Sequence, residues 1–117
     1  MYQILINRAE QDGTLEFSNG GVVISTTCWW DPSHKIPEQS YYSCSATTMA
    51  SKRNSEGLPR EAIYINGVSG YTGIFIHMGY NSSWSDGCIV IPEAEMVQIY
   101  NTITPKDARN VTVTVRG

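Results

Sequence analysis

The chain has 117 residues, 41% of them hydrophobic and 16% charged, and it carries a formal net charge of −3 at pH 7. This length allows one small domain, residues 1–117, and leaves no room for a second. The slight negative charge gives no basic footprint for nucleic acid, and no apolar run is long enough to span a bilayer.

The first part of the chain predicts a β-meander. Residues 2–8 (YQILINR) combine β-branched and aromatic residues and predict a strand. Residues 14–17 and 22–26 flank Asn19-Gly20, and Asn-Gly between two such runs is the strongest short hairpin signal. This pattern favours an antiparallel sheet.

The middle of the chain alternates loops and strands. Residues 28–35 (CWWDPSHK) predict a loop, in which we interpret the two tryptophans as packing residues and His34 as a solvated side chain. Residues 41–49 predict a strand. The polar run at 50–58 lacks periodicity and predicts an exposed loop.

The last part of the chain adds four strands, one of which opens at Cys88, and a helix. Residues 62–65 and 73–77 predict short strands. A helix begins at Pro92, since proline suits the first helical position, and apolar residues recur at helical spacing over 96–103. Residues 110–116 (NVTVTVR) alternate strictly and predict the closing strand. The whole pattern predicts a mainly β fold with one helix, a small antiparallel or mixed β-sandwich.

The three cysteines cannot all pair within the chain. If Cys88 is the free one, Cys28 and Cys44 are left either as a disulfide or as two buried thiols, and only geometry decides between them. No group of histidine, cysteine and carboxylate residues has the spacing of zinc ligands. The sequence therefore predicts neither a metal nor an organic cofactor.

Residues 73–92 (GIFIHMGYNSSWSDGCIVIP) gather the side chains that nucleophilic catalysis requires. One predicted strand ends at His77 and the next opens at Cys88. If these strands are neighbours, the imidazole can take the thiol proton and leave a thiolate–imidazolium pair. Gly87 permits a sharp turn, and the N–H groups of Gly87 and Cys88 would be free to face an oxyanion.

Other residues are candidates for supporting roles. Ser85, Asp86 or a backbone carbonyl could orient the imidazole, and the sequence does not choose among them. Tyr80 and Trp84 could wall a substrate groove or could cover the underside of their own loop. Arg60, just before the predicted strand at 62–65, is a candidate cationic contact for substrate.

The segment 85–89 (SDGCI), which follows His77 after a loop, resembles the active-site signature of the L,D-transpeptidase catalytic domain. It also resembles the short transpeptidase-like modules of phage-related proteins and interbacterial toxin effectors. Two positions depart from the family pattern. Asp86 replaces a histidine that often precedes Gly-Cys, and Val90 stands where an arginine is common. Such an arginine would hold a substrate carboxylate as a bidentate partner.

The resemblance extends beyond this signature. Residues 35–41 (KIPEQSY) are similar to the Ile-Pro-x-Gly-x-Tyr step that opens a central strand in the family, with Gln39 in place of the usual glycine. Residues 60–65 and 73–77 resemble the strand pair that follows. The likeness therefore covers roughly residues 15–91.

This resemblance implies the L,D-transpeptidase fold and cysteine-dependent acyl transfer on the stem peptide of peptidoglycan. Cys88 would attack a peptide carbonyl after His77 takes its proton. The thioester would then pass to an amine, giving transpeptidation or D-amino-acid exchange, or to water, giving carboxypeptidase activity. No cofactor is implied.

Other functions fit parts of the same pattern. One is a non-catalytic phage or secretion-associated module that keeps the fold for binding or assembly, with Cys88 as an inert core thiol. Another is a cysteine hydrolase of protein amides. The N-terminus lacks the features of a signal peptide, so we expect cytoplasmic synthesis and delivery to the periplasm by a secretion system, a phage particle or lysis. In that setting an immunity or carrier protein is an expected partner.

Overall fold

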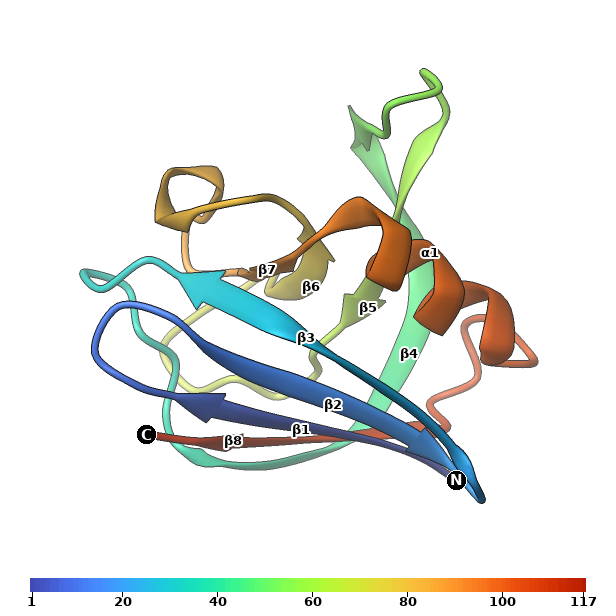
Figure 1. The fold of residues 1–117 in the computed structure, drawn as a ribbon, viewed down its shortest axis with the longest axis horizontal. Coiled ribbons are helices and arrows are strands. Elements are labelled where there is room, and N and C mark those ends of the chain that lie inside the picture. Colours follow the sequence, from blue (N-terminus) through green and yellow to red (C-terminus); the bar gives the residue numbers. More distant parts are fainter.

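Strands make up most of the fold, as the alternating sequence predicts. The structure, a computed structural model, describes all 117 residues (Figure 1). The elements in chain order are β1 (Tyr2–Arg8), β2 (Gly13–Asn19), β3 (Val22–Trp30), β4 (Gln39–Arg53), β5 (Pro59–Tyr64), β6 (Phe75–Met78), the 3₁₀ turn η1 (Ser82–Trp84), β7 (Ile89–Ile91), α1 (Glu93–Thr102) and β8 (Val111–Arg116).

The strands close into one barrel in the order β1-β2-β3-β7-β6-β5-β4-β8. Neighbouring strands are antiparallel except for two pairs, because β1 runs parallel to β8 and β6 runs parallel to β7. The sheet is therefore mixed, and the expected mainly β fold with one helix is confirmed. Closure is narrow between β3 and β7, which pair only at Trp29 and Trp30, so residues 22–28 of β3 pair with β2 alone.

Strand alternation sends every second side chain into the barrel. Ile4 and Ile6 on β1 and Phe17 on β2 are at most 2% exposed and belong to a core cluster of 23 buried residues. Each such side chain contributes roughly 1.5–3 kcal/mol by leaving water. Helix α1 adds Met96 and Ile99 to this core and packs against β3, β5 and β6. None of the helical segments has the length and apolar character needed to cross a membrane.

Two segments predicted as loops belong to strands. β3 continues through Trp30, which pairs with Ile89 of β7 and is 3% exposed, so the interpretation of Trp30 as a packing residue is confirmed. β4 continues to Arg53 and forms with β5 a hairpin that projects from the barrel (Figure 1). A projecting two-stranded hairpin exposes both faces to water, so its polar sequence carries no apolar alternation to recognise.

Cys28 and Cys44 are two buried thiols and do not form a disulfide. The Cys44 thiol donates to the Tyr41 carbonyl over 3.4 Å. Burial raises the pKa of Cys28 to about 12. A thiol with such a pKa stays protonated at neutral pH and is a poor nucleophile. Cys28 and Cys44 are fully buried, whereas Cys88 is 8% exposed, so reactivity has to be sought at Cys88.

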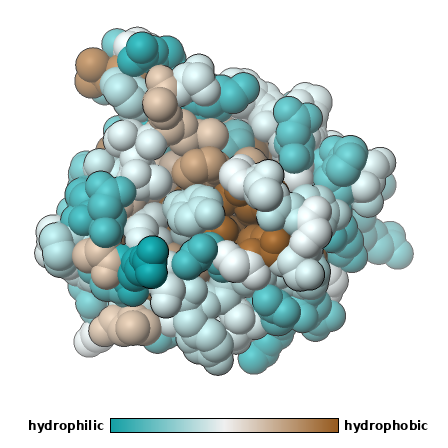
Figure 2. Space-filling model, turned by 180° about the vertical axis from the view of Figure 1, so that it is seen from behind, coloured by the Kyte–Doolittle hydropathy of each residue, from teal (hydrophilic) through white to brown (hydrophobic).

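The surface is mostly polar, as Figure 2 shows for the face turned away from the viewer in Figure 1. A recess with an apolar floor lies near the middle of this face and is framed by polar side chains. Such recesses are typical of surfaces that bind small ligands.

Candidate active site

His77 and Cys88 lie on the outer face of the barrel, on adjacent strands. His77 is on β6, and Cys88 directly precedes β7. The parallel register pairs His77 with Val90. Cys88 lies two residues before Val90, so its side chain is on the same face of the sheet as that of His77. The residues between them in the pleat, Ile76 and Ile89, point inward and belong to the core. The condition on which a His77–Cys88 pair depends is met, because the two strands are neighbours, and they run parallel.

Both side chains open into one cavity of about 190 Å³, which we call the cysteine cavity. It lies where β4, β5 and β6 meet the loop that carries Trp84. Its lining consists of Met49, Lys52, Arg60, Gly73, His77, Trp84, Asp86 and Cys88.

The imidazole of His77 is held in one tautomer. Its Nδ1 lies 2.8 Å from the carbonyl oxygen of Met78. A carbonyl only accepts, so Nδ1 carries the hydrogen, and in the neutral ring Nε2 keeps a free lone pair. Among the three orienting groups that the sequence left open, the backbone carbonyl occupies this position.

The ring of His77 is neutral in the folded chain, because burial lowers its pKa below the ordinary value of 6.5. The Met78 carbonyl opposes this shift, while the charges of Arg60 and Lys52 act in the same direction as burial. The side chain is only 4% exposed. The result is an oriented, unprotonated base beside the cysteine cavity.

The thiol of Cys88 points toward β6 and makes no hydrogen bond to His77. Its sulfur accepts from the Phe75 N–H over 3.4 Å, and its hydrogen is directed at the Gly73 carbonyl, 3.8 Å away. Burial raises the pKa of Cys88 above its ordinary value of 9.0. The expected thiolate–imidazolium pair is therefore absent from this resting structure, because burial disfavours the charged form of both groups.

Ser85 holds the backbone that precedes the sulfur and does not orient the imidazole. Its buried hydroxyl donates to the Cys88 carbonyl and accepts from the N–H groups of Gly87 (3.2 Å) and Asp31 (3.1 Å). The N–H of Gly87 is thus occupied, contrary to expectation, while the N–H of Cys88 has no hydrogen-bond partner. Asp86 lines the cysteine cavity but makes no hydrogen bond to His77.

The turn at Gly87 requires glycine. Its φ of +104° is a conformation that L side chains rarely adopt. A Cβ there would also lie 3.3 Å from Cδ1 of Ile74. The sharp turn predicted before Cys88 is present, and Gly87 and Ser85 together fix where the sulfur stands.

Replacing Ser85 by alanine should lower the free energy of unfolding by about 1–3 kcal/mol, because two N–H groups and a carbonyl lose their buried partner. Chemical denaturation followed by circular dichroism measures this change. The matched control is Ser83→Ala, which removes an exposed hydroxyl of the same loop and should change stability by less than about 0.5 kcal/mol. Equal effects of the two variants would contradict the role assigned to Ser85.

The predicted substrate-contact residues lie together only in part. Trp84 and Arg60 both line the cysteine cavity, and the Arg60 guanidinium lies 5.8 Å from the centre of the Trp84 ring. Tyr80 packs edge-on against Trp84, outside the lining, and its hydroxyl accepts from the Glu93 N–H over 3.4 Å. Lys52, in the run at 50–58 that predicted an exposed loop, belongs to β4 and lines the cavity.

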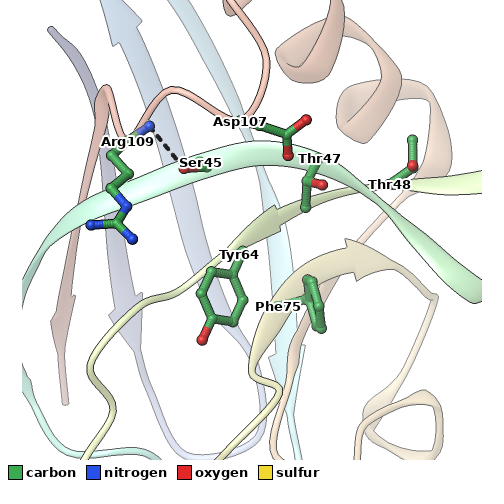
Figure 3. A pocket seen from close by; sticks show the side chains of 7 residues that line it. All are labelled: Ser45, Thr47, Thr48, Tyr64, Phe75, Asp107 and Arg109. Carbon is green, nitrogen blue, oxygen red and sulfur yellow. Dashed lines mark hydrogen bonds between the residues drawn. The ribbon is translucent and has the colours of Figure 1, made fainter.

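A second and larger cavity, of about 290 Å³, lies on the same outer face (Figure 3). We call it the arginine cavity. Its lining comes from β4, β5, β6 and the loop before β8, so no short stretch of sequence pointed to it. The residues are Ser45, Thr47, Thr48, Tyr64, Phe75, Asp107 and Arg109.

A small β-barrel with a cysteine and an oriented imidazole in one cavity has the elements of a cysteine acyl-transfer enzyme. The family model of the L,D-transpeptidase catalytic domain (YkuD) matches residues 1–115. The chain therefore belongs to the L,D-transpeptidase catalytic domain family, whose chemistry is cysteine-dependent acyl transfer on peptidoglycan stem peptides. A search of curated proteins gave no match.

Proposed function

We propose that Cys88 and His77 transfer an acyl group from a peptidoglycan stem peptide through a thioester on Cys88. The observation that carries this proposal is the cysteine cavity itself, which holds the thiol and the oriented imidazole on the same face of adjacent strands. Membership of the L,D-transpeptidase family supplies the substrate class.

The first half of the reaction begins with a rotation of the Cys88 side chain from the Gly73 carbonyl toward His77. Hydrogen bonds between a catalytic base and its nucleophile are often long in a free enzyme and shorten when substrate fills the site. Nε2 of His77 takes the thiol proton as the sulfur attacks the peptide carbonyl. The unoccupied N–H of Cys88 donates to the developing oxyanion. The C–N bond then breaks, and His77 returns the proton to the leaving amine.

The second half releases the acyl group. An amine or a water molecule attacks the thioester carbonyl, and His77 takes the proton from this nucleophile. The C–S bond breaks, and the sulfur of Cys88 regains a proton from His77. An amine acceptor gives transpeptidation or D-amino-acid exchange, and water gives carboxypeptidase activity.

The charges of the cysteine cavity favour a donor that ends in a carboxylate. Lys52 on β4 and Arg60 on β5 both line it, and neither side chain forms an ion pair. They supply the positive charge that an arginine at position 90 provides in the common family pattern. We propose that they bind the terminal carboxylate of the donor peptide, while the Trp84 ring forms one wall.

The pH profile should reflect His77. Burial lowers the pKa of His77, so kcat/KM should be constant across neutral pH and should fall only below pH 6.5, where the base becomes protonated. Arg60→Gln removes one positive charge that lowers this pKa, and it should move the acid limb to higher pH. Initial rates between pH 4.5 and 8 measure both effects. An acid limb above pH 6.5 in the unaltered protein would contradict the assignment.

Incubation with purified stem tetrapeptides, followed by mass analysis, tests the function. Loss of the terminal D-alanine indicates hydrolysis, exchange for an added D-amino acid indicates transfer to a small amine, and peptide dimers indicate cross-linking. Each product should be absent with Cys88→Ala. Tetrapeptides that remain unchanged would contradict the proposal.

A second candidate, the non-catalytic binding module, is favoured by one observation. The Cys88 thiol is protonated and makes no hydrogen bond to His77 in the resting structure. The tetrapeptide experiment separates the two functions, because a module would bind the peptide without changing its mass.

A further inference from the structure

The arginine cavity carries two opposite charges that have no partner in the protein. Arg109 and Asp107 lie on either side of Ser45 at its rim (Figure 3). Neither side chain forms an ion pair, and the single ion pair of the chain joins His34 and Asp31. Both side chains are exposed, and both line the same cavity.

The loop that carries these charges is fixed to β4 at both residues. The N–H of Arg109 donates to the Ser45 hydroxyl over 2.9 Å, and the N–H of Asp107 donates to the Ala46 carbonyl over 2.8 Å. Both residues have left-handed backbones, with φ of +53° and +57°. Aspartate tolerates this conformation more readily than most residues, whereas glycine would be less strained than Arg109.

The arginine cavity is adjacent to the proposed nucleophile. Its aromatic wall consists of Tyr64 and Phe75, whose ring centres are 5.4 Å apart. The N–H of the same Phe75 donates to the Cys88 sulfur over 3.4 Å. The strand register also pairs Phe75 with Tyr64 and Tyr64 with Ser45, so one row of residues crosses the sheet from the sulfur to this rim.

We propose that the arginine cavity binds a zwitterionic amino-acid head group, with its carboxylate on Arg109 and its ammonium on Asp107. The hydroxyls of Thr47 and Thr48 line the same cavity, and the aromatic wall packs against the aliphatic part of the ligand. This inference rests on the proposed acyl transfer and assigns a second recognition site to it. An ammonium held by Asp107 is not a nucleophile, so the cavity recognises its ligand and does not activate it.

Two sources supply this chemistry near a stem peptide. One is a free amino acid. The other is the side-chain end of the peptide's own diamino acid, where an amino and a carboxyl group share one carbon. Lysine in the same position retains the ammonium and lacks the carboxylate, so a pair of tetrapeptides that differ only in this carboxylate isolates the contribution of Arg109.

The kinetic test measures KM and kcat for this pair of tetrapeptides. Arg109→Gln should raise KM about tenfold or more for the carboxylated peptide and leave the lysine peptide unchanged, as loss of a charge-assisted hydrogen bond predicts. Asp107→Asn should raise KM for both peptides. The matched controls are Arg116→Gln and Asp12→Asn, which change exposed charges outside both cavities and should have no effect.

A binding measurement with Cys88→Ala identifies the source and does not depend on turnover. Backbone amide signals of Thr47 and Thr48 should shift on titration with free D-alanine if the ligand is a free amino acid. They should shift only with the carboxylated tetrapeptide if the ligand belongs to the peptide. In either case Arg109→Gln should remove the shift.

Unchanged KM values in both variants, together with the absence of amide shifts, would overturn this inference. If D-alanine release then still depends on Cys88, the proposed function stands and only the second recognition site is wrong. If the amides shift while no peptide is processed, the site is supported and the acyl-transfer proposal is wrong.

Discussion

Replacing Cys88 by serine should reduce release of D-alanine from stem tetrapeptides by about 10³-fold or more. The fold should be retained, because a hydroxyl fits the position of the sulfur beside the Phe75 N–H and the Gly73 carbonyl. A serine at this site would need a far stronger base than an imidazole with a lowered pKa, so the acyl-enzyme intermediate should no longer form at a useful rate. Single-turnover assays with mass detection of the thioester measure the loss directly.

The matched control for this variant is Cys44→Ser. It exchanges a buried thiol for a hydroxyl that can still donate to the Tyr41 carbonyl, and Cys44 belongs to the core and lines neither cavity. It should keep the turnover number and change only stability. Substantial release of D-alanine by Cys88→Ser would contradict the assignment of Cys88 as the nucleophile.

Replacing His77 by glutamine should lower kcat by about 10²–10⁴-fold, the usual contribution of a general base. The glutamine amide can still donate to the Met78 carbonyl, so the local backbone is kept while the proton acceptor is lost. The acid limb of the pH profile should disappear with it. Stability should respond as well, because the lowered pKa of His77 makes the unaltered fold lose stability as pH falls below 6.5, and the variant lacks this loss.

His34→Gln is the control for a histidine substitution in general. His34 is exposed and its Nδ1 lies 2.8 Å from the Asp31 carboxylate, outside both cavities. We expect its kcat and pH profile to match those of the unaltered protein. A His77→Gln variant with full kcat would assign the base to another group and would contradict the mechanism.

Local sequence signals predicted the elements that depend on local chemistry. The hairpin signalled by Asn19-Gly20 is present and turns at Gly20-Gly21, and the helix after Pro92 and the strand at the C-terminus are present as well. The error at residues 28–30 arose because Cys28 pairs with Gly13 of β2, while Trp29 and Trp30 pair with β7, about sixty positions later. No pattern inside a short window reports such a partner.

In the candidate site, too, local sequence predicted some features, while others depend on residues that are distant in the chain. His77, Cys88 and Gly87 stood within one stretch, and the structure brings the first two into one cavity. Their protonation states were not predictable, because the lowered pKa of His77 and the raised pKa of Cys88 both come mainly from burial in the assembled barrel. The arginine cavity was missed because its residues come from four separate segments.

The position of the resting sulfur has a practical consequence for chemical probes. The Cys88 thiol is protonated and turned toward Gly73, so electrophilic fragments selected only for intrinsic thiol reactivity should label it slowly. An effective covalent inhibitor would first need a recognition group that occupies the cysteine cavity and turns the Cys88 side chain toward His77. Screens against this protein should therefore rank compounds by the ratio of inactivation rate to binding constant, and not by warhead strength.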